Sequence, residues 1–185
     1  MSTQPLEQAI QSTRSVLEGV KRDQLASPTP CKSWTVSQLV DHIVGGQYFF
    51  AAAINGEPLG GEQRTFADGD FLAEFDKGSA ACLAAFGSPD AMDRTVKMPF
   101  GDMPGSRFVG LATTDTFVHG WDLAKATGQT DRLDPELAEA GYGIAVAILQ
   151  PQFRNDEGDP FAPLVAVSDA APIYDRLAGF AGRTP

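Results

Sequence analysis

One histidine and one carboxylate in this sequence are spaced so that they can act together. Asp115 and His119 are four residues apart in a segment whose apolar residues recur at helical spacing, so both side chains project from one face of a predicted helix. That face also carries the apolar residues that must reach the core, where a carboxylate is unfavourable unless it is paired or bound to a metal. The other histidine of the chain, His42, lies on the apolar side of an earlier predicted helix.

These three side chains predict a site for one divalent metal ion, provided that the two helices are neighbours. Two imidazoles and a carboxylate suit zinc, and zinc sites with three protein ligands leave a position for water or substrate. Nickel, copper or iron accept the same ligands, and helical bundles commonly build such sites from facing helices. Spacing alone also allows a metal-free alternative, in which Asp115 and His119 form an ordinary buried or surface pair.

Two further side chains have both a functional and a structural interpretation. Asp122, three residues after His119, could orient that imidazole by accepting a hydrogen bond, or could lie exposed on the helix or at its cap. Cys31 precedes a predicted helix and is expected to be a small buried apolar residue, with metal ligation or thiol chemistry as the alternative. No catalytic acid or base is assigned, because both histidines are predicted ligands.

The two tryptophans and one arginine allow similar alternatives. Trp34 and Trp121 are expected to pack in the core, although either could line a pocket. Arg107 could bind a substrate carboxylate at the mouth of a bundle, or could lie in solvent.

The elements that must position these residues are predicted to be helices, from apolar periodicity and from signals at their ends. Thr35 and Gln38 have the spacing of a capping box. Gly128 can adopt the left-handed conformation that ends a helix, and Asp134 can cap the next one. Helices are predicted over residues 5–21, 35–55, 70–86, 106–126 and 134–149, a short helical piece over 174–181 and a small β-hairpin over 94–105. The fold class is therefore all-α, a four-helix bundle with an additional helix.

Composition limits the classes of protein that the chain can belong to. Its 185 residues are expected to form a single domain over 1–185, with an ordinary 43% of hydrophobic and 21% of charged residues. No apolar stretch approaches the ~20 residues of a membrane span, and no secretory leader is recognisable. Two cysteines are compatible with a reducing cytoplasm. A net charge of −10 argues against partners such as nucleic acid or an anionic membrane.

Three runs of sequence resemble a known family. Pro-Thr-Pro-Cys-Lys-Ser-Trp-Thr-Val over 28–36 leads into Leu-Val-Asp-His-Ile-Val-Gly-Gly over 39–46. A second run, Asp-Thr-Phe-Val-His-Gly-Trp-Asp-Leu-Ala-Lys-Ala-Thr-Gly, covers 115–128, and a third, Asp-Arg-Leu-Ala-Gly-Phe-Ala-Gly-Arg, covers 175–183. Together they resemble the N-terminal domain of the mycothiol-dependent maleylpyruvate isomerase family and, more closely, the actinobacterial metal-binding proteins grouped with it.

The resemblance implies a DinB/YfiT-like four-helix bundle that holds a divalent metal, usually zinc. The family's ligands are a histidine on the second helix and an acid followed four positions later by a histidine, which fall here on His42, Asp115 and His119. Asp115 stands where the family often has glutamate, so this ligand arm is one methylene shorter.

The resemblance also implies a class of function. Relatives use the metal to activate a thiol or water, which implies a metal-dependent S-transferase or isomerase-like enzyme that acts on a small molecule with a low-molecular-weight, mycothiol-type thiol. No counterpart of the separate C-terminal domain of the full isomerase is found, so we expect a stand-alone relative, with a homodimer suggested by the family. The alternative is a non-catalytic module that binds a metal or a small ligand.

Overall fold

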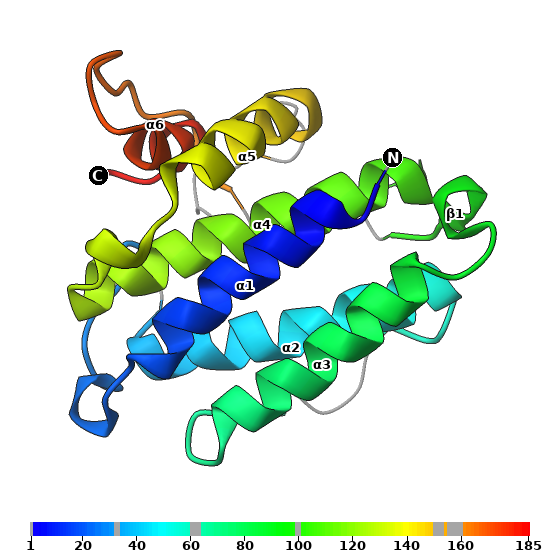
Figure 1. Ribbon diagram of the computed structural model, residues 1–185, viewed down its shortest axis with the longest axis horizontal. Helices are drawn as coiled ribbons and strands as arrows, with labels where there is room; N and C mark the ends of the chain where they lie inside the picture. Colours follow the sequence, from blue (N-terminus) through cyan, green and yellow to red (C-terminus); the bar gives the residue numbers. More distant parts are fainter. Residues whose placement is uncertain (1, 32–33, 60–63, 99–100, 150–153, 155–160) are drawn as a thin grey trace.

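The computed structural model describes residues 2–31, 34–59, 64–98, 101–149, 154 and 161–185, and helices dominate it (Figure 1). The α-helices are α1 (Gln4–Glu18), α2 (Val36–Asn55), α3 (Phe71–Phe86), α4 (Gly105–Thr127), α5 (Pro135–Ile148) and α6 (Ile173–Phe180). The short 3-10 helices are η1 (Arg22–Gln24), η2 (Ala91–Asp93) and η3 (Thr130–Arg132), and the strands are β1 (Thr95–Val96) and β2 (Met103–Pro104).

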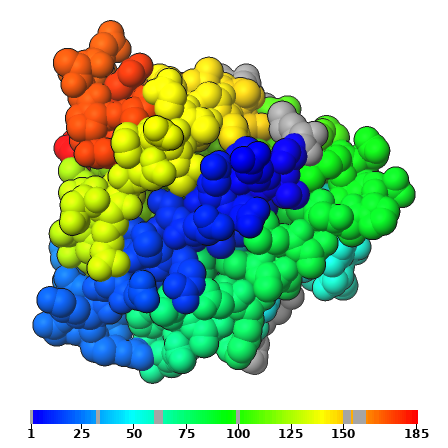
Figure 2. Space-filling model, in the orientation of Figure 1, coloured from blue at the N-terminus to red at the C-terminus, as the bar shows by residue number. Residues whose placement is uncertain are grey.

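Helices α1 to α4 form the bundle, and each of them packs against two neighbours in it. Helix α1 lies against α4 and α3, and α2 lies against the same two helices from the other side. Helices α5 and α6 pack on each other and on α4, and α5 also reaches α1 (Figure 1). One face of the molecule shows α1 bordered by α5 on one side and by α3 on the other (Figure 2). The predicted all-α bundle with additional helical segments is confirmed.

The ends of most helices follow the signals in the sequence. Thr35 caps α2 by accepting the N–H of Gln38 at 3.4 Å, while the Gln38 side chain accepts the N–H of Thr35 at 2.9 Å. Gly128 ends α4 with a left-handed φ of 72°. Asp134 caps α5 by accepting the N–H of Glu136 at 2.8 Å. These local predictions are confirmed.

The first helix ends earlier than predicted, at Glu18 instead of Lys21. The N–H of Gly19 bonds back to the carbonyl of Val16, and the N–H of Lys21 goes to the side chain of Gln24, so the helical ladder is not continued. Gly19 also passes so close to the residues after α4 that a Cβ there would lie 1.9 Å from the Gln129 side-chain oxygen. The chain therefore leaves the helix at the point where it meets the segment after α4.

The predicted hairpin is present as two short antiparallel strands that lead into α4. Val96 pairs with Met103 and Thr95 pairs with Pro104. No helix among the residues that the structure describes is long and apolar enough to cross a membrane.

Helix α4 is buried on almost every side, because α1, α2, α5 and α6 all pack against it. It lies close against α1 at Gly120, where a Cβ would lie 2.4 Å from the hydroxyl oxygen of Thr13. That hydroxyl donates a hydrogen bond to the carbonyl of Thr116 at 2.9 Å. The polar residues of α4 are therefore held inside the protein.

Candidate metal centre

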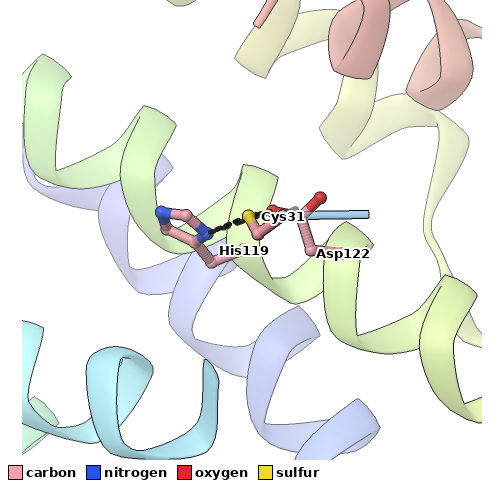
Figure 3. Close-up of side chains that lie close together, drawn as sticks. All are labelled: Cys31, His119 and Asp122. Atoms are coloured by element: carbon pink, nitrogen blue, oxygen red, sulfur yellow. Dashed lines mark hydrogen bonds and ion pairs between the residues drawn. The ribbon is translucent and has the colours of Figure 1, made fainter. Parts of the chain in front are cut away.

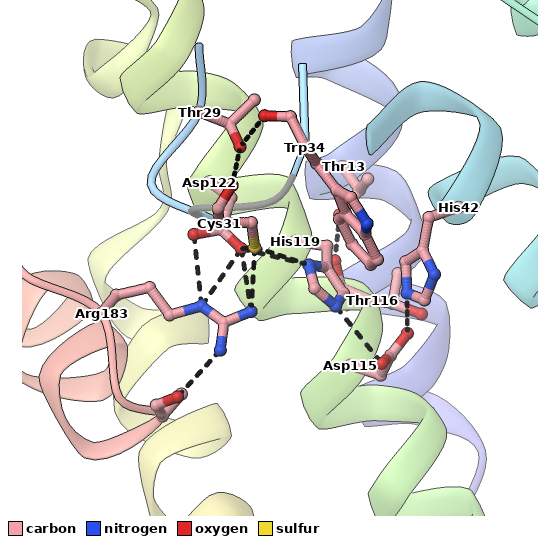
Figure 4. A network of polar contacts seen from close by, with 11 residues as sticks. Thr13, Thr29, Cys31, Trp34, His42, Asp115, Thr116, His119, Asp122 and Arg183 are labelled. Carbon is pink, nitrogen blue, oxygen red and sulfur yellow. Dashed lines mark hydrogen bonds and ion pairs between the residues drawn. The ribbon is translucent and has the colours of Figure 1, made fainter. Parts of the chain in front are cut away.

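The structure brings the three predicted ligands together between α2 and α4 (Figure 4). His42 Nε2 lies 3.7 Å from Asp115 Oδ2, and His119 Nε2 lies 3.5 Å from Asp115 Oδ1. The two imidazole rings meet edge to face with their centroids 4.4 Å apart. Each of the three residues offers one ligand atom, and these atoms all lie within 4.8 Å of one another.

These separations fit a divalent ion better than a set of hydrogen bonds. Two ligands at the ~2.0–2.2 Å bond lengths of zinc lie about 3.3–3.6 Å apart in a tetrahedral site, close to the 3.5 and 3.7 Å between these atoms. His42 Nε2 is buried and has no hydrogen-bond partner among the described residues. A buried nitrogen of this kind is unfavourable unless something satisfies it. The donor set therefore fits a metal ion.

The charges in the cluster favour an ionised Asp115. Burial alone would raise the pKa of Asp115, but the imidazoles of His119 and His42 hold it well below its ordinary value. Burial alone would lower the pKa of His119, but the carboxylates of Asp115 and Asp122 raise it well above its ordinary value. Both shifts reflect the attraction between the carboxylate of Asp115 and the imidazole of His119, which lie 3.5 Å apart.

Asp122 lies on the opposite side of the His119 ring from Asp115. Its Oδ2 is 3.1 Å from His119 Nδ1, and the two side chains are 0% and 2% exposed. The interpretation of Asp122 as an exposed residue is therefore wrong. A carboxylate that accepts the Nδ1–H of a histidine fixes the ring and leaves the Nε2 lone pair free, and here Nε2 faces Asp115.

Arg183, in the C-terminal tail, holds Asp122 from the other side (Figure 4). Its Nη2 lies 3.1 Å from Asp122 Oδ2, and its Nε lies 3.3 and 3.2 Å from Oδ1 and Oδ2. This charge holds the pKa of Asp122 below its ordinary value although burial would raise it. No role for Arg183 was predicted from the sequence, where its one signal is the C-terminal run that resembles the family.

Cys31, His119 and Asp122 form a second group of potential ligands (Figure 3). Cys31 Sγ lies 3.1 Å from Asp122 Oδ2 and 3.9 Å from His119 Nδ1. The guanidinium of Arg183 already contacts both Asp122 and Cys31, the latter with Nη2 at 3.3 Å from Sγ. A metal ion in this group would have to displace that positive charge, so the group around Asp115 is the better metal site.

Trp34 covers the two imidazoles (Figure 4). Its ring centroid lies 4.5 Å from that of His42 and 5.5 Å from that of His119. The loop before α2 is held by the hydroxyl of Thr29, which lies 2.9 Å from the carbonyl oxygen of Trp34 and 3.0 Å from that of Cys31. Trp34 therefore lines the site, and the expectation that it packs in the core is incomplete.

The other two residues singled out in the sequence lie away from the cluster. Trp121 is 1% exposed, and its indole N–H donates to Asp175 at 3.1 Å, so it packs in the core as expected. Arg107 lies in the first turn of α4, eight residues before Asp115, which corresponds to about 12 Å along the helix. A role for Arg107 in substrate binding stays a prediction.

Comparison with known proteins gives one family and two relatives. The model of the mycothiol maleylpyruvate isomerase N-terminal domain matches residues 6–124, more than half of the chain. Two uncharacterized proteins of Mycobacterium tuberculosis, from strains CDC 1551 / Oshkosh and ATCC 25618 / H37Rv, are each 42% identical over 172 residues, which cover 92% of this chain and 91% of the relative. No solved structure matches the chain significantly.

Proposed function

We propose that this chain, which belongs to the mycothiol maleylpyruvate isomerase N-terminal domain family, binds one divalent metal ion, most simply zinc, through His42, Asp115 and His119. We further infer that the ion serves a thiol S-transferase or isomerase-like reaction. The substrate is a small molecule, and the co-substrate is a low-molecular-weight thiol of the mycothiol type.

One observation carries the proposal: among the described residues, three protein side chains direct a donor to one point, and two of these side chains are partly exposed. The side chain of His42 is 34% exposed and that of Asp115 is 14% exposed, whereas that of His119 is 2% exposed. A structural zinc ion is normally enclosed by four protein ligands, and a catalytic one keeps an open position. Three protein donors, two of them on partly exposed side chains, therefore favour a catalytic ion over a structural one.

A divalent ion at this point would act as a Lewis acid and lower the pKa of a bound thiol or water. The residues of the chain do the positioning. Asp115 turns one oxygen toward each imidazole, and Asp122 locks the His119 ring with Nε2 directed at the cluster. Trp34 shields the two rings from solvent on its side.

Metal content and thiol-dependent turnover of protein made without a histidine tag test the proposal. Elemental analysis should find about one divalent ion per chain. Asp115→Asn should weaken its binding, because a neutral amide replaces the charged carboxylate ligand, and His119→Ala should lose it, because it removes an imidazole ligand. Asp76→Asn is the matched control, since that carboxylate pairs with Arg14 on the surface and is 45% exposed. Consumption of a mycothiol-type thiol should be followed with a panel of electrophiles.

The outcomes separate the enzyme from the non-catalytic module. A metal-loaded protein whose turnover disappears in His119→Ala, with the fold retained, would support the enzyme. A metal-loaded protein without turnover on the whole panel would favour a binding module and contradict catalysis. Protein that neither contains nor takes up a divalent ion would contradict both.

A further inference from the structure

We propose that Arg183 is a positioning residue of the metal centre, so that the C-terminal tail completes a site whose ligands lie on α2 and α4. Arg183 holds both oxygens of Asp122, and Asp122 holds the His119 ring. The inference rests on the proposed function, because it requires His119 to bind a metal.

The contacts of the guanidinium fix it from several directions. Besides its bonds to Asp122, its Nη1 donates to the carbonyl of Ala181 at 2.8 Å and its Nη2 lies 3.3 Å from Cys31 Sγ. Arg183 is only 4% exposed. A planar guanidinium with its donors engaged on three partners has no freedom to follow a moving carboxylate. Asp122 is therefore held in one orientation, and the ring of His119 is held with it.

The backbone of the tail is shaped to deliver this side chain. Gly182 has a left-handed φ of 87°, and a Cβ there would lie 2.6 Å from the carbonyl oxygen of Ala162. The N–H of Arg183 then bonds back to the carbonyl of Ala178 at 2.9 Å, close to the end of α6. This turn directs Arg183 toward α4. The matched family region ends at residue 124, so the residue that completes the site lies outside it.

A competing explanation is that Arg183 only anchors the tail. Asp175 provides a comparison, because it also joins the C-terminal segment to α4, through the indole of Trp121 at 3.1 Å, but it does not touch the His119–Asp122 pair. Loss of the Asp175 bond should loosen the tail and leave the metal centre unchanged. Loss of the Arg183 bonds should change the metal centre itself.

A double-mutant cycle on zinc affinity tests the proposal. Partners that orient a ligand typically contribute 10–100-fold to metal affinity, so Arg183→Gln should weaken zinc binding by about that factor. Asp122→Asn should do the same. If Arg183 acts through Asp122, adding Arg183→Gln to Asp122→Asn should change the zinc Kd by less than about twofold. Competition with a chromophoric chelator measures the four affinities.

Removal of one partner of a buried ion pair is strongly destabilising, so Arg183→Gln can fail to fold. The conservative variant Arg183→Lys is then measured in its place. Lysine keeps the charge but not the planar set of donors. We expect Arg183→Lys to weaken zinc binding in the wild-type protein and to have no further effect when it is combined with Asp122→Asn. Cobalt provides a second readout, since the visible spectrum of the bound ion reports its ligand geometry. The spectrum should change in Arg183→Lys and stay unchanged in Asp175→Ala, which removes the acceptor of the Trp121 indole.

Each alternative outcome would overturn the inference. Wild-type zinc affinity in both Arg183 variants would overturn it. An equal loss of zinc affinity on Arg183→Gln with and without Asp122→Asn would also overturn it. A loss in Asp175→Ala as large as that in Arg183→Gln would assign the effect to anchoring of the tail. A wild-type protein that binds no zinc would overturn the proposed function together with the inference, whereas tight binding that ignores Arg183 would overturn the inference alone.

Discussion

Replacement of Gly120 by alanine should weaken the contact that positions α4 against α1. A Cβ at residue 120 would lie 2.4 Å from the Thr13 hydroxyl oxygen, 3.2 Å from Thr13 Cβ and 3.4 Å from Thr13 Cα. The hydroxyl can turn away only by giving up its 2.9 Å hydrogen bond to the carbonyl of Thr116. The other two atoms cannot turn away, because one is backbone and the other is attached to it. The two helices must therefore separate.

The magnitude follows from three contributions. Forcing an extra carbon into a packed interior costs about 1–3 kcal/mol. Loss of the Thr13 hydrogen bond costs about 1 kcal/mol. Alanine in place of glycine inside a helix raises the free energy of unfolding by about 1 kcal/mol. Gly120→Ala should therefore lower the free energy of unfolding by about 1–3 kcal/mol, and it should also weaken metal binding, since His119 is the preceding residue.

Urea unfolding of the metal-free protein measures the effect, and the chain offers a matched control. Gly143 is an exposed helical glycine of α5, and a Cβ there would meet nothing within 4 Å. Gly143→Ala should therefore raise stability by about 0.5–1 kcal/mol. Adding Thr13→Ala to Gly120→Ala should recover part of the loss. If Gly120→Ala were as stable as wild type, or stabilised like the control, the packing argument would be refuted.

The remaining predictions concern the two cysteines and the metal. Burial raises the pKa of Cys82 to about 12, whereas the thiol of the unfolded chain ionises at lower pH. The free energy of unfolding should therefore fall by about 1–2 kcal/mol between about pH 8 and 10. Cys82→Val should remove this contribution when the free energy of unfolding is measured with urea across that pH range. In the native protein iodoacetamide should alkylate the partly exposed Cys31 before the buried Cys82, and equal labelling in peptide mass spectrometry would contradict this. Zinc at about 100 times its Kd should raise the free energy of unfolding by about 2.7 kcal/mol, and His42→Ala should lose most of that gain, measured with and without chelator.

The helices could be predicted because their signals are local. The capping pair Thr35 and Gln38, and the terminal Gly128, act on backbone groups within a few residues. The end of α1 could not be predicted in this way, because it depends on Gln129, more than a hundred residues away. The burial of α4 on nearly all sides was also not evident, since it depends on α5 and α6 packing over a face that periodicity alone leaves open.

The clustering of His42, Asp115 and His119 could be predicted for a different reason. With two histidines in the chain, and one of them in helical register with Asp115, few combinations of donors were available. The contact of Asp122 with His119 could be predicted because the two residues are three positions apart on one helix. The contact of Arg183 with Asp122 could not, because the two residues are 61 positions apart and the direction of Arg183 depends on a left-handed turn at Gly182.

Aspartate is long enough at position 115 because the glycine at position 46 of α2 leaves space for its carboxylate to approach that helix. Gly46 lies one turn after His42 on α2, and a Cβ at Gly46 would be 3.9 Å from Asp115 Oδ2, in ordinary contact. A larger side chain at this position would extend into the carboxylate that faces both imidazoles. Aspartate has one rotatable bond fewer than glutamate, so less side-chain entropy is lost when it is held in one orientation. The small residue on α2 and the short acid on α4 are therefore complementary, and together they keep His42 within 3.7 Å of its partner.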